Sequence, residues 1–292
     1  MGLFSRRSRE HEPVQPGAGA SPGQEPPSAP AAAPPAAEPG SGVRHDRVRE
    51  ALGTWAERKD ARTFADVLRR AVSGELLLDV TDSRLADPAR GFQQGDTLAI
   101  ASTRDNAGAD LLVAFTGHDE LQRMRQAAGR SLVQPAAAVL AQAVRDHQGI
   151  VIDGRAPGAF IAYAAEIRQH LTEEPEAVAR LTEATTTRSL PFAQYVEALA
   201  AGPLFVPVAA GAEDGSDGSD GPAGPAATGP DGGAYTVVGT SPAEVWAWRP
   251  GGEVRRVGLG EVAAATLAAA RAGIVVNPAG PPVVVPAAAL PR

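Results

Sequence analysis

Cysteine is absent from the 292-residue chain, which excludes disulfides, thiolate metal sites and thiol nucleophiles. Lys59 is the sole lysine, so arginine supplies the rest of the 27 basic residues. The net charge of −7 leaves no concentration of positive charge, and we therefore expect no nucleic-acid partner. Aromatic residues make up 4% of the chain, so the core must be built mainly from Ala, Val, Leu and Ile.

Long hydrophobic runs are also absent. No segment approaches the roughly 18 uncharged apolar residues that span a membrane, and the apolar segment Val262–Ala270 ends at Arg271. The basic segment Met1–Pro13 lacks the apolar region of a secretory signal, and Arg6 stands where myristoylation needs Ser or Thr. Together with the absence of cysteine, these features predict a soluble, cytoplasmic protein that contacts no membrane.

Two segments have compositions that cannot support a packed core. Pro, Ala, Gly, Glu and Ser dominate the N-terminal region, so we expect residues 1–45 to form a disordered tail. Residues 211–233 are rich in Gly and Asp and are expected to form a disordered acidic loop. In this loop Asp214, Asp217 and Asp220 are spaced three apart, whereas calcium loops place ligands two apart and end in glutamate, so no metal site is predicted.

The rest of the chain repeats itself. Residues 64–80 align without a gap with residues 192–208, and residues 111–161 align in the same way with residues 235–285. Matching residues across helix, strand and turn positions are hard to produce from an alanine-rich composition alone. The sequence therefore predicts two tandem copies of one α/β unit.

Each copy is predicted to be an α/β domain of the α+β type, a small mixed sheet with flanking helices. We place copy 1 at residues 46–171 and copy 2 at residues 172–292. Apolar residues at helical spacing predict a helical pair over Val48–Trp55 and Phe64–Val72. A hairpin is expected over Thr97–Phe115 in copy 1. Because copy 2 has the acidic loop in its place, the second sheet is expected to be smaller by one strand.

Each copy ends in a β-turn-β element, Gly149–Ile161 in copy 1 and Gly273–Val285 in copy 2. Two apolar runs flank a turn that begins at Asp153 or Asn277. Aspartate and asparagine suit this position because their side chains bond the backbone two residues on.

Two junctions between a strand and a helix carry helix-start signals. Ser241, Pro242 and Glu244 form a predicted capping box with proline at the first helical position. Thr116 with Asp119 is expected to start a helix in copy 1 in the same way. Helix initiation, rather than an anion site, is the favoured interpretation of both junctions.

No sequence motif marks a reaction. The chain contains no GxSxG elbow, no GxxxxGK[ST] loop and no GxGxxG after a strand. No histidine pairs with a carboxylate or a second histidine at metal-binding spacing, and surface positions are expected for all of them. The histidines are His11, His45, His118, His147 and His170. We therefore predict no catalytic residue, no bound metal, no cofactor and no enzymatic activity.

Two tryptophans lie close together on a predicted helix of copy 2. Trp246 aligns with Gln122 of copy 1, and Trp248 aligns with Met124. Residues two apart on a helix point to different faces, so Trp248 is expected in the core and Trp246 is expected to face outward. Trp246 is the candidate interface residue, either across the contact between the copies or toward a partner.

The order of these motifs resembles the N-terminal domain of the SseB family of bacterial proteins, here present twice. The resemblance is carried by "GELLLDV" and "GPLFVPV", by "FTGHDELQRM" and "GTSPAEVWAW", and by "GIVIDGRAPG" and "GIVVNPAGPP", and it covers Val48–Tyr163 and Ala177–Leu290. Two positions depart from the pattern, since Asp79 replaces the usual proline and Gly239 the usual aromatic residue. The resemblance implies a non-enzymatic accessory or interaction protein with no catalytic residues.

Binding to a protein partner is the favoured function, as an accessory or regulatory module whose two copies can engage one partner at two points. The alternative is a small-ligand binder or an enzyme with its site in the cleft between the copies. A third interpretation is a structural subunit of a larger assembly. The first function predicts an exposed apolar patch near Trp246, and the second predicts a deep cleft with converging polar side chains.

Overall fold

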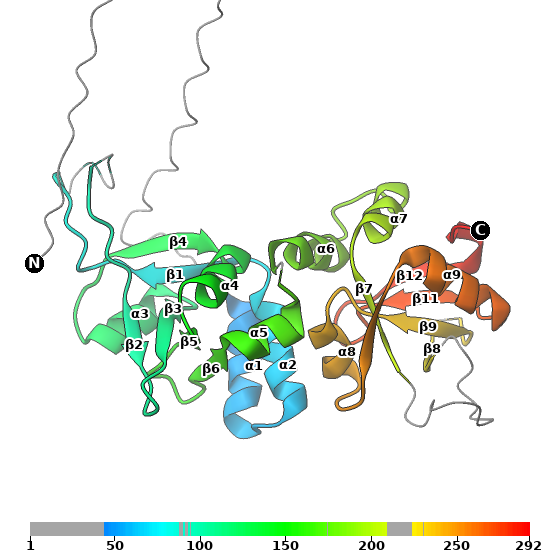
Figure 1. Ribbon diagram of the computed structural model, residues 1–292, viewed down its shortest axis with the longest axis horizontal. Helices are drawn as coiled ribbons and strands as arrows, with labels where there is room; N and C mark the ends of the chain where they lie inside the picture. The colour runs from blue at the N-terminus through cyan, green and yellow to red at the C-terminus, as the bar shows by residue number, and fades with distance from the viewer. Residues whose placement is uncertain are drawn as a thin grey trace, which may run out of the picture. The chain divides into compact units, whose positions relative to one another are not determined.

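A computed structural model describes residues 44–87, 90, 93, 95–173, 175–208, 224–229 and 231–292 (Figure 1). The predicted disordered tail lies outside these residues except at its last two positions. There the prediction is wrong, because Arg44 forms a β-bridge with Gly117 and the backbone N–H of His45 donates to the Thr116 carbonyl over 2.8 Å. The first described residues are therefore anchored to copy 1.

Copy 1 is a mixed sheet with helices on both faces, as predicted. Its strands follow the order β4-β1-β3-β5-β6, and β2 pairs with β3. Strands β3 and β5 run parallel, whereas the other pairs are antiparallel. The elements are α1 (Asp46–Glu57), α2 (Ala61–Ala71), β1 (Glu75–Asp79), β2 (Ser102–Arg104), β3 (Asp110–Phe115), α3 (His118–Arg125), β4 (Ser131–Pro135), α4 (Ala136–Arg145), β5 (Gly149–Ile152), β6 (Phe160–Tyr163) and α5 (Ala164–Leu171).

The strands of copy 1 bury alternate side chains on opposite faces, as a period of two residues requires. Leu76 and Leu78 belong to the cluster formed with α1, α2, α4 and α5. Leu77 belongs to the cluster on the other face, which α3 covers through Leu121. Because both faces are covered, β1 is apolar at consecutive positions instead of alternating.

The predicted helical pair of copy 1 is confirmed as α1 and α2. Helix α2 begins at a capping box in which Asp60 accepts from the Thr63 backbone N–H and Thr63 accepts from the Asp60 N–H. It ends at Ala71, and Gly74 follows with a φ of 83°, a left-handed conformation that glycine adopts at little cost. The pair thereby places the arginines of α2 on the side of copy 1 that faces copy 2.

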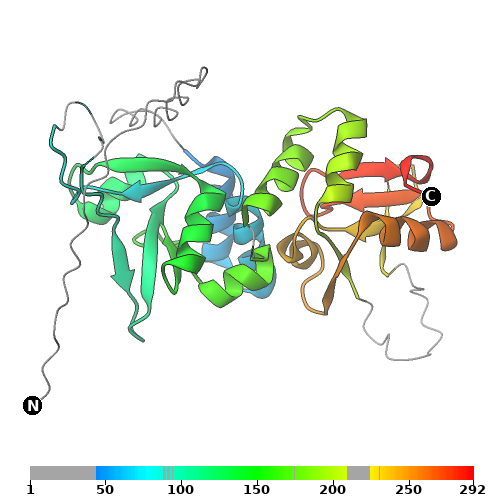
Figure 2. The same ribbon diagram turned by 45° about the horizontal axis from the view of Figure 1, so that its top comes forward.

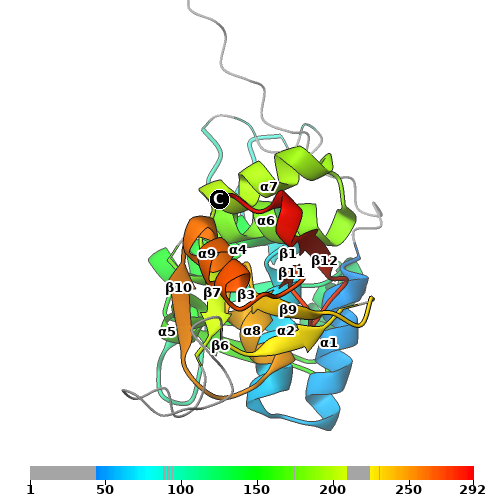
Figure 3. The same ribbon diagram turned by 90° about the vertical axis from the view of Figure 1, so that its right-hand side faces the viewer.

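Copy 2 repeats this topology. Its sheet order is β12-β11-β9-β8, and β7 pairs with β10 and is bridged to the end of β9 through Phe205 and Gly239. The equivalent pair in copy 1 is Leu77 with Phe115. Helices α7 and α9 pack on one face, and α8 packs on the other (Figures 1 and 3). The elements are α6 (Pro175–Thr187), α7 (Phe192–Ala201), β7 (Leu204–Pro207), β8 (Ala226–Thr228), β9 (Ala234–Val238), α8 (Pro242–Trp248), β10 (Val254–Val257), α9 (Leu259–Ala268), β11 (Gly273–Val276), β12 (Val283–Pro286) and the 3₁₀ turn η2 (Ala287–Ala289).

The prediction that the second sheet lacks a strand is wrong. Within the predicted acidic loop 211–233, residues 211–223 and 230 lie outside the described residues, but Ala226–Thr228 forms β8 and pairs antiparallel with β9. Strand β8 is therefore the counterpart of β2, which pairs with β3 in copy 1. The backbone of β9 offers hydrogen bonds at that edge, and a short alanine-rich segment satisfies them despite its composition.

The gap-free alignment of the copies is wrong in two places. Strand β1 pairs Leu77 with Val133, whereas β7 pairs Phe205 with Arg256, so β10 is one residue out of the aligned register. The turn between the last two strands is also one residue shorter in copy 2, since Gly149 pairs with Tyr163 but Gly273 pairs with Pro286. The parallel pairs β3–β5 and β9–β11 keep the aligned register.

Duplication of the fold is nevertheless confirmed, because the strand order, the parallel pair and the helix on each face recur in both copies. In Figure 2 the helices lie beside the strands in copy 1 (cyan and green strands) and in copy 2 (yellow to red strands). The segments Gly149–Ile161 and Gly273–Val285 lie in equivalent surroundings. Each contributes a central strand that pairs parallel to its neighbour and the strand that follows it.

Candidate functional site

A buried polar contact recurs at the same place in both copies. In copy 1 one carboxylate oxygen of Asp153 accepts from the Thr116 backbone N–H over 2.9 Å, and the other accepts from the Thr116 hydroxyl over 2.6 Å. In copy 2 Asn277 accepts from the Thr240 N–H over 2.9 Å and donates to the Thr240 hydroxyl over 2.9 Å. The sequence prediction of a bond within the turn is wrong, because these side chains tie together the ends of two parallel strands.

Burial raises the pKa of Asp153 to about 6, although the two hydrogen bonds from Thr116 oppose the shift. Asp153 and Asn277 are each 3% exposed and hold left-handed φ angles of 50° and 55°. Asparagine and aspartate adopt this conformation more readily than other non-glycine residues. Because the same contact ties two parallel strands together in both copies, we assign it a structural role and no role in binding.

A helix begins at both predicted junctions, α8 in copy 2 and α3 in copy 1, but the predicted capping box is half formed in copy 2 and absent in copy 1. Ser241 is the N-cap of α8, accepts from the Glu244 N–H over 3.4 Å and is followed by Pro242. The reciprocal half of the capping box is absent, because the Glu244 side chain is buried against copy 1. In copy 1 the N-cap of α3 is Gly117, since the Thr116 hydroxyl is bonded to Asp153.

The histidines do not share the predicted surface position. His11 lies outside the described residues, and His45 is buried with Nε2 2.5 Å from the Ser73 carbonyl. Burial lowers the pKa of His45, so its ring is neutral at neutral pH. His147 is partly buried and lies 2.7 Å from the Asp110 carboxylate. No group of three His, Asp or Glu side chains with metal-binding geometry occurs among the described residues.

Trp246 lies at the contact between the copies. Its ring is partly buried and stands 4.7 Å from that of His170 on α5 of copy 1, and its Nε1 donates to the Gly252 carbonyl over 3.3 Å. Trp248 is half-buried and packs on the opposite face of α8, against Tyr235 and its neighbours. The two rings therefore point to different faces, as their spacing requires.

The contact is made chiefly by α2 of copy 1 and α8 of copy 2. Ala243 and Ala247 of α8 belong to the core cluster of copy 1, where small side chains let the two helices approach closely. Arg62 donates from Nε to the Ala247 carbonyl over 3.0 Å, and Arg69 donates from Nη2 to the Ala279 carbonyl over 3.0 Å. The copies are therefore joined by packing and by directed hydrogen bonds.

A small polar cavity of about 140 Å³ opens beside this contact. Glu244 and Arg69 both face it and are 2% and 9% exposed. Arg69 Nη1 lies 3.8 Å from Glu244 Oε2, which is too far for a hydrogen bond. The lining residues are Arg47, Arg69, Arg70, Ser73, Thr182, Thr186, Glu244, Ala279, Gly280 and Pro281.

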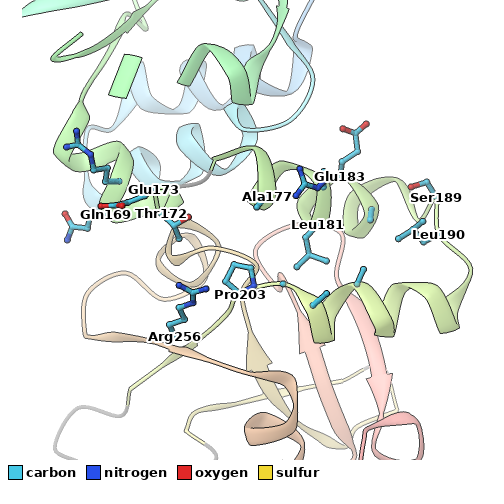
Figure 4. A pocket seen from close by; sticks show the side chains of 16 residues that line it. Gln169, Thr172, Glu173, Ala177, Leu181, Glu183, Ser189, Leu190, Pro203 and Arg256 are labelled. Carbon is cyan, nitrogen blue, oxygen red and sulfur yellow. The ribbon is translucent and has the colours of Figure 1, made fainter. Parts of the chain in front are cut away.

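A larger groove of about 1190 Å³ lies between the α5–α6 connection, α6, α7 and β10 (Figure 4). In Figure 4 Leu181 and Arg256 point into the groove, whereas Glu183 points away from α7. Aliphatic side chains dominate the wall beside α6 and α7, and charged side chains stand around it. The lining residues are Arg168, Gln169, Thr172, Glu173, Ala177, Arg180, Leu181, Glu183, Ala184, Ser189, Leu190, Ala198, Ala201, Gly202, Pro203 and Arg256.

The family model of the SseB protein N-terminal domain matches the chain twice, over residues 48–169 and 176–291. The chain belongs to the SseB family. No curated protein and no solved structure matches it. The two matched regions coincide with the two copies of the fold, so each copy is one SseB domain. Among the described residues no helix is long and apolar enough to cross a membrane.

The two SseB domains share the buried threonine contact but not the cavity or the groove. Glu120, the counterpart of Glu244, is paired with Arg123 of its own helix, and Glu197, the counterpart of Arg69, is exposed. The cavity and the groove are therefore formed only where the two domains are joined in tandem. The sequence analysis named a cleft between the copies as the alternative site but did not identify its residues. Glu244 gave one signal, because it lies in the otherwise apolar helix Pro242–Trp248, a pattern typical of a helix buried on all sides.

Trp246→Gln is expected to leave both SseB domains folded and to lower the free energy of unfolding by about 2 kcal/mol, because the ring contact with His170 and its apolar burial are lost. Urea unfolding followed by circular dichroism measures the loss. Phe192→Gln, at a side chain that is 48% exposed, is the control and is expected to change stability by less than about 0.5 kcal/mol. A large loss of helical signal before urea is added would contradict the assignment of Trp246 to the contact alone.

Proposed function

We propose that this tandem SseB protein is a non-enzymatic, cytoplasmic protein-binding module whose groove holds an acidic, aliphatic segment of a partner protein. The observation that carries the proposal is the groove, which has an aliphatic wall and two arginines, Arg180 and Arg256, that form no ion pair among the described residues. Protein binding, the favoured function of the sequence analysis, is retained, but the binding site is the groove and not Trp246. Trp246 packs against His170 at the contact between the domains.

The wall of the groove favours apolar side chains. Leu181 and Ala184 are buried beneath it, and Leu190 remains 37% exposed at its edge. A partner side chain seated here would remove apolar surface from water on both molecules, at about 25 cal/mol per Å². Phe192, which follows Leu190 at the start of α7, is 48% exposed and extends the apolar surface beyond the groove.

The charge of the groove favours an acidic segment, because three arginines and two glutamates line it. Arg180 and Arg256 line it and have no ion-pair partner among the described residues. Arg168 also lines the groove and donates to the Val144 carbonyl over 3.2 Å. Because free guanidinium groups recognise carboxylates with two parallel hydrogen bonds, they select Asp or Glu on the partner.

The size of the groove fits a chain segment better than a metabolite. Ligand pockets for small molecules enclose roughly 300–1,000 Å³ and bury most of the ligand. The groove is about 1190 Å³ and has exposed side chains along its rim. A peptide segment contributes several side chains to such a surface, which a compact metabolite cannot do.

The test is quantitative affinity capture from the native cell with the wild-type chain, Arg180→Glu/Arg256→Glu and Arg255→Glu. Arg255 is adjacent on β10, does not line the groove and forms an exposed ion pair with Glu261, so it is the matched control. A partner retained by the wild type and the control is expected to be reduced at least about tenfold by the double charge reversal.

The captured partner is then purified and titrated against the three chains by calorimetry. Groove binding predicts the same order of affinities, and weaker binding as salt rises, because the contacts are ionic at an exposed rim. Equal capture and equal affinity for all three chains would place the partner elsewhere and overturn the proposal.

A further inference from the structure

Glu244 and Arg69, which line the polar cavity between the two SseB domains, each have one buried side-chain atom without a hydrogen bond to any described residue. Among the described residues, Oε2 of Glu244 and Nε of Arg69 are buried atoms without a hydrogen bond. Leaving such groups unsatisfied costs more than most hydrogen bonds contribute, so buried polar atoms are nearly always bonded. The cavity therefore needs an occupant that supplies both a donor and an acceptor.

Within the part of the chain that the structure describes, the ion pairs and hydrogen bonds around the cavity leave Oε2 of Glu244 and Nε of Arg69 without a hydrogen bond. Asp66 engages the Nη2 side of Arg69, and Glu50 engages Nη1 of Arg70 over 2.8 Å, both from copy 1. Thr182 is bonded to the Thr240 hydroxyl over 2.9 Å. Glu244 is left with a guanidinium 3.8 Å away, across a space that can hold a small group.

The lining selects an anion that carries a proton. Arg47, Arg69 and Arg70 line the cavity. Asp66 and Glu50 pair with Arg69 and Arg70, whereas Arg47 has no ion pair among the described residues, so Arg47 supplies the positive charge that is left for an anion. An anionic oxygen would satisfy the guanidinium groups, and an O–H would satisfy Glu244. A volume of about 140 Å³ holds a tetrahedral oxyanion, because one water needs only about 10–15 Å³ on the same measure.

We propose that this cavity binds a small protonated oxyanion, of which hydrogen phosphate is the simplest, with the arginines of α1 and α2 holding its oxygens and Glu244 accepting its O–H. The site is distinct from the groove and does not rest on the protein-binding proposal. Occupancy would join α1 and α2 of the first domain to α6 and α8 of the second.

The ionisation of Glu244 suits this role above neutral pH. Burial raises the pKa of Glu244 to about 7, with Asp66 acting in the same direction and Arg69, Arg70 and Arg47 opposing it. At pH 8 the side chain is therefore mostly an ionised acceptor. Hydrogen phosphate still carries one proton there, whereas sulfate carries none.

The experiment is titration calorimetry of the full chain with inorganic phosphate and with sulfate at pH 8. Phosphate is expected to bind at least about tenfold more tightly than sulfate, because sulfate leaves the Glu244 carboxylate facing an anion without a shared proton. Binding of neither ion at millimolar concentration, or equal binding of both, would overturn the proposal.

Two variants separate this site from general attraction of anions. Glu244→Gln keeps the shape of the side chain and can donate its amide N–H, so the preference for phosphate over sulfate is expected to disappear. Glu120→Gln, at the equivalent position of the first domain, is expected to keep it. A preference that survives Glu244→Gln would overturn the assignment of Glu244. Circular dichroism of both variants verifies that they are folded.

Two further measurements define the ligand. Arg47→Ala removes an exposed arginine of the cavity and is expected to weaken phosphate binding at least about tenfold, while Arg44→Ala is not. Glycerol 3-phosphate is larger, and at pH 8 its phosphate carries no proton, so both the size of the cavity and the Glu244 carboxylate predict weaker binding than for hydrogen phosphate. Equal or tighter binding would overturn the role of the shared proton.

Discussion

Replacing Gly149 by alanine is expected to lower the free energy of unfolding by at least about 3 kcal/mol. A Cβ atom at this position would lie 2.4 Å from the Ala162 carbonyl oxygen and 2.8 Å from the Tyr163 Cα. Both atoms belong to the backbone of β6, which pairs with Gly149 itself. No side-chain rotation can relieve the clash, so β5 and β6 must separate at the end of the pair that is farthest from the turn.

The duplication provides a second copy of this experiment. A Cβ at Gly273 would lie 2.2 Å from the Val285 carbonyl oxygen, and Gly273→Ala is expected to cost as much in the second SseB domain. Gly53→Ala is the control, because Gly53 is exposed in the middle of α1 and a Cβ there meets nothing within 4 Å. That variant is expected to gain up to about 1 kcal/mol. Urea unfolding measures all three, and equal stabilities would contradict the close approach of the strands.

The two-domain architecture could be predicted from the sequence because helix, strand and turn patterns all recur in the second copy. Apolar strands flanked by helical patterns predicted the layers, and the copies agree in strand order and in the parallel pair. The alignment was wrong around β10 because α9 is rich in alanine, and its register in the alignment changes little when it is shifted by one residue. Ala270 with a φ of 48° lies in the connection between α9 and β11, where the register is restored.

Strand β8 was missed for a different reason. Residues Ala226–Thr228 have no run of β-branched or aromatic residues, and proline and glycine surround them, so composition indicates a loop. The strand forms because β9 offers an unpaired edge, which is a property of the neighbouring strand and not of the segment itself. Local sequence cannot report such a condition.

A cleft between the copies was expected as an alternative, but the residues that line the cavity and the groove could not be predicted because they come from both domains. Arg69 and Glu244 are far apart in the chain, and only the packing of α2 on α8 brings them together. The sequence predicts a helix-capping role for Glu244. That role explains the hydrogen bond of its backbone N–H to Ser241 but not the position of its carboxylate. A charged residue in an apolar helix was the available signal, and its meaning depended on a partner that the sequence does not identify.

Exchanging the residues of the two buried threonine contacts is expected to give opposite, pH-dependent changes in stability. Asp153→Asn reproduces the contact that Asn277 makes in the second domain, with one bond accepted from the Thr116 N–H and one donated to its hydroxyl. The variant therefore keeps both hydrogen bonds and removes a buried ionisable group.

The sign follows from the raised pKa of Asp153, which is about 6 in the folded protein against an ordinary value of 3.8 for an aspartate. A raised folded pKa favours folding most fully below the unfolded value, and that advantage is lost as pH rises through 6. Above pH 6 the buried carboxylate therefore destabilises the fold, by about 2–3 kcal/mol at pH 8. Glu120 adds to this effect and Arg49 opposes it. Asp153→Asn should recover that free energy at pH 8 and little of it at pH 4.

Asn277→Asp is the reciprocal change and is expected to destabilise the second domain at pH 8 and much less at pH 4, because the new carboxylate is buried in the same surroundings. Urea unfolding at the two pH values measures both variants. Asp146→Asn is the control, since Asp146 is exposed and its loss should change stability by less than about 0.5 kcal/mol at either pH. A change for Asp153→Asn that is the same at pH 4 and pH 8 would show that the Asp153 carboxylate has no raised pKa in the folded protein.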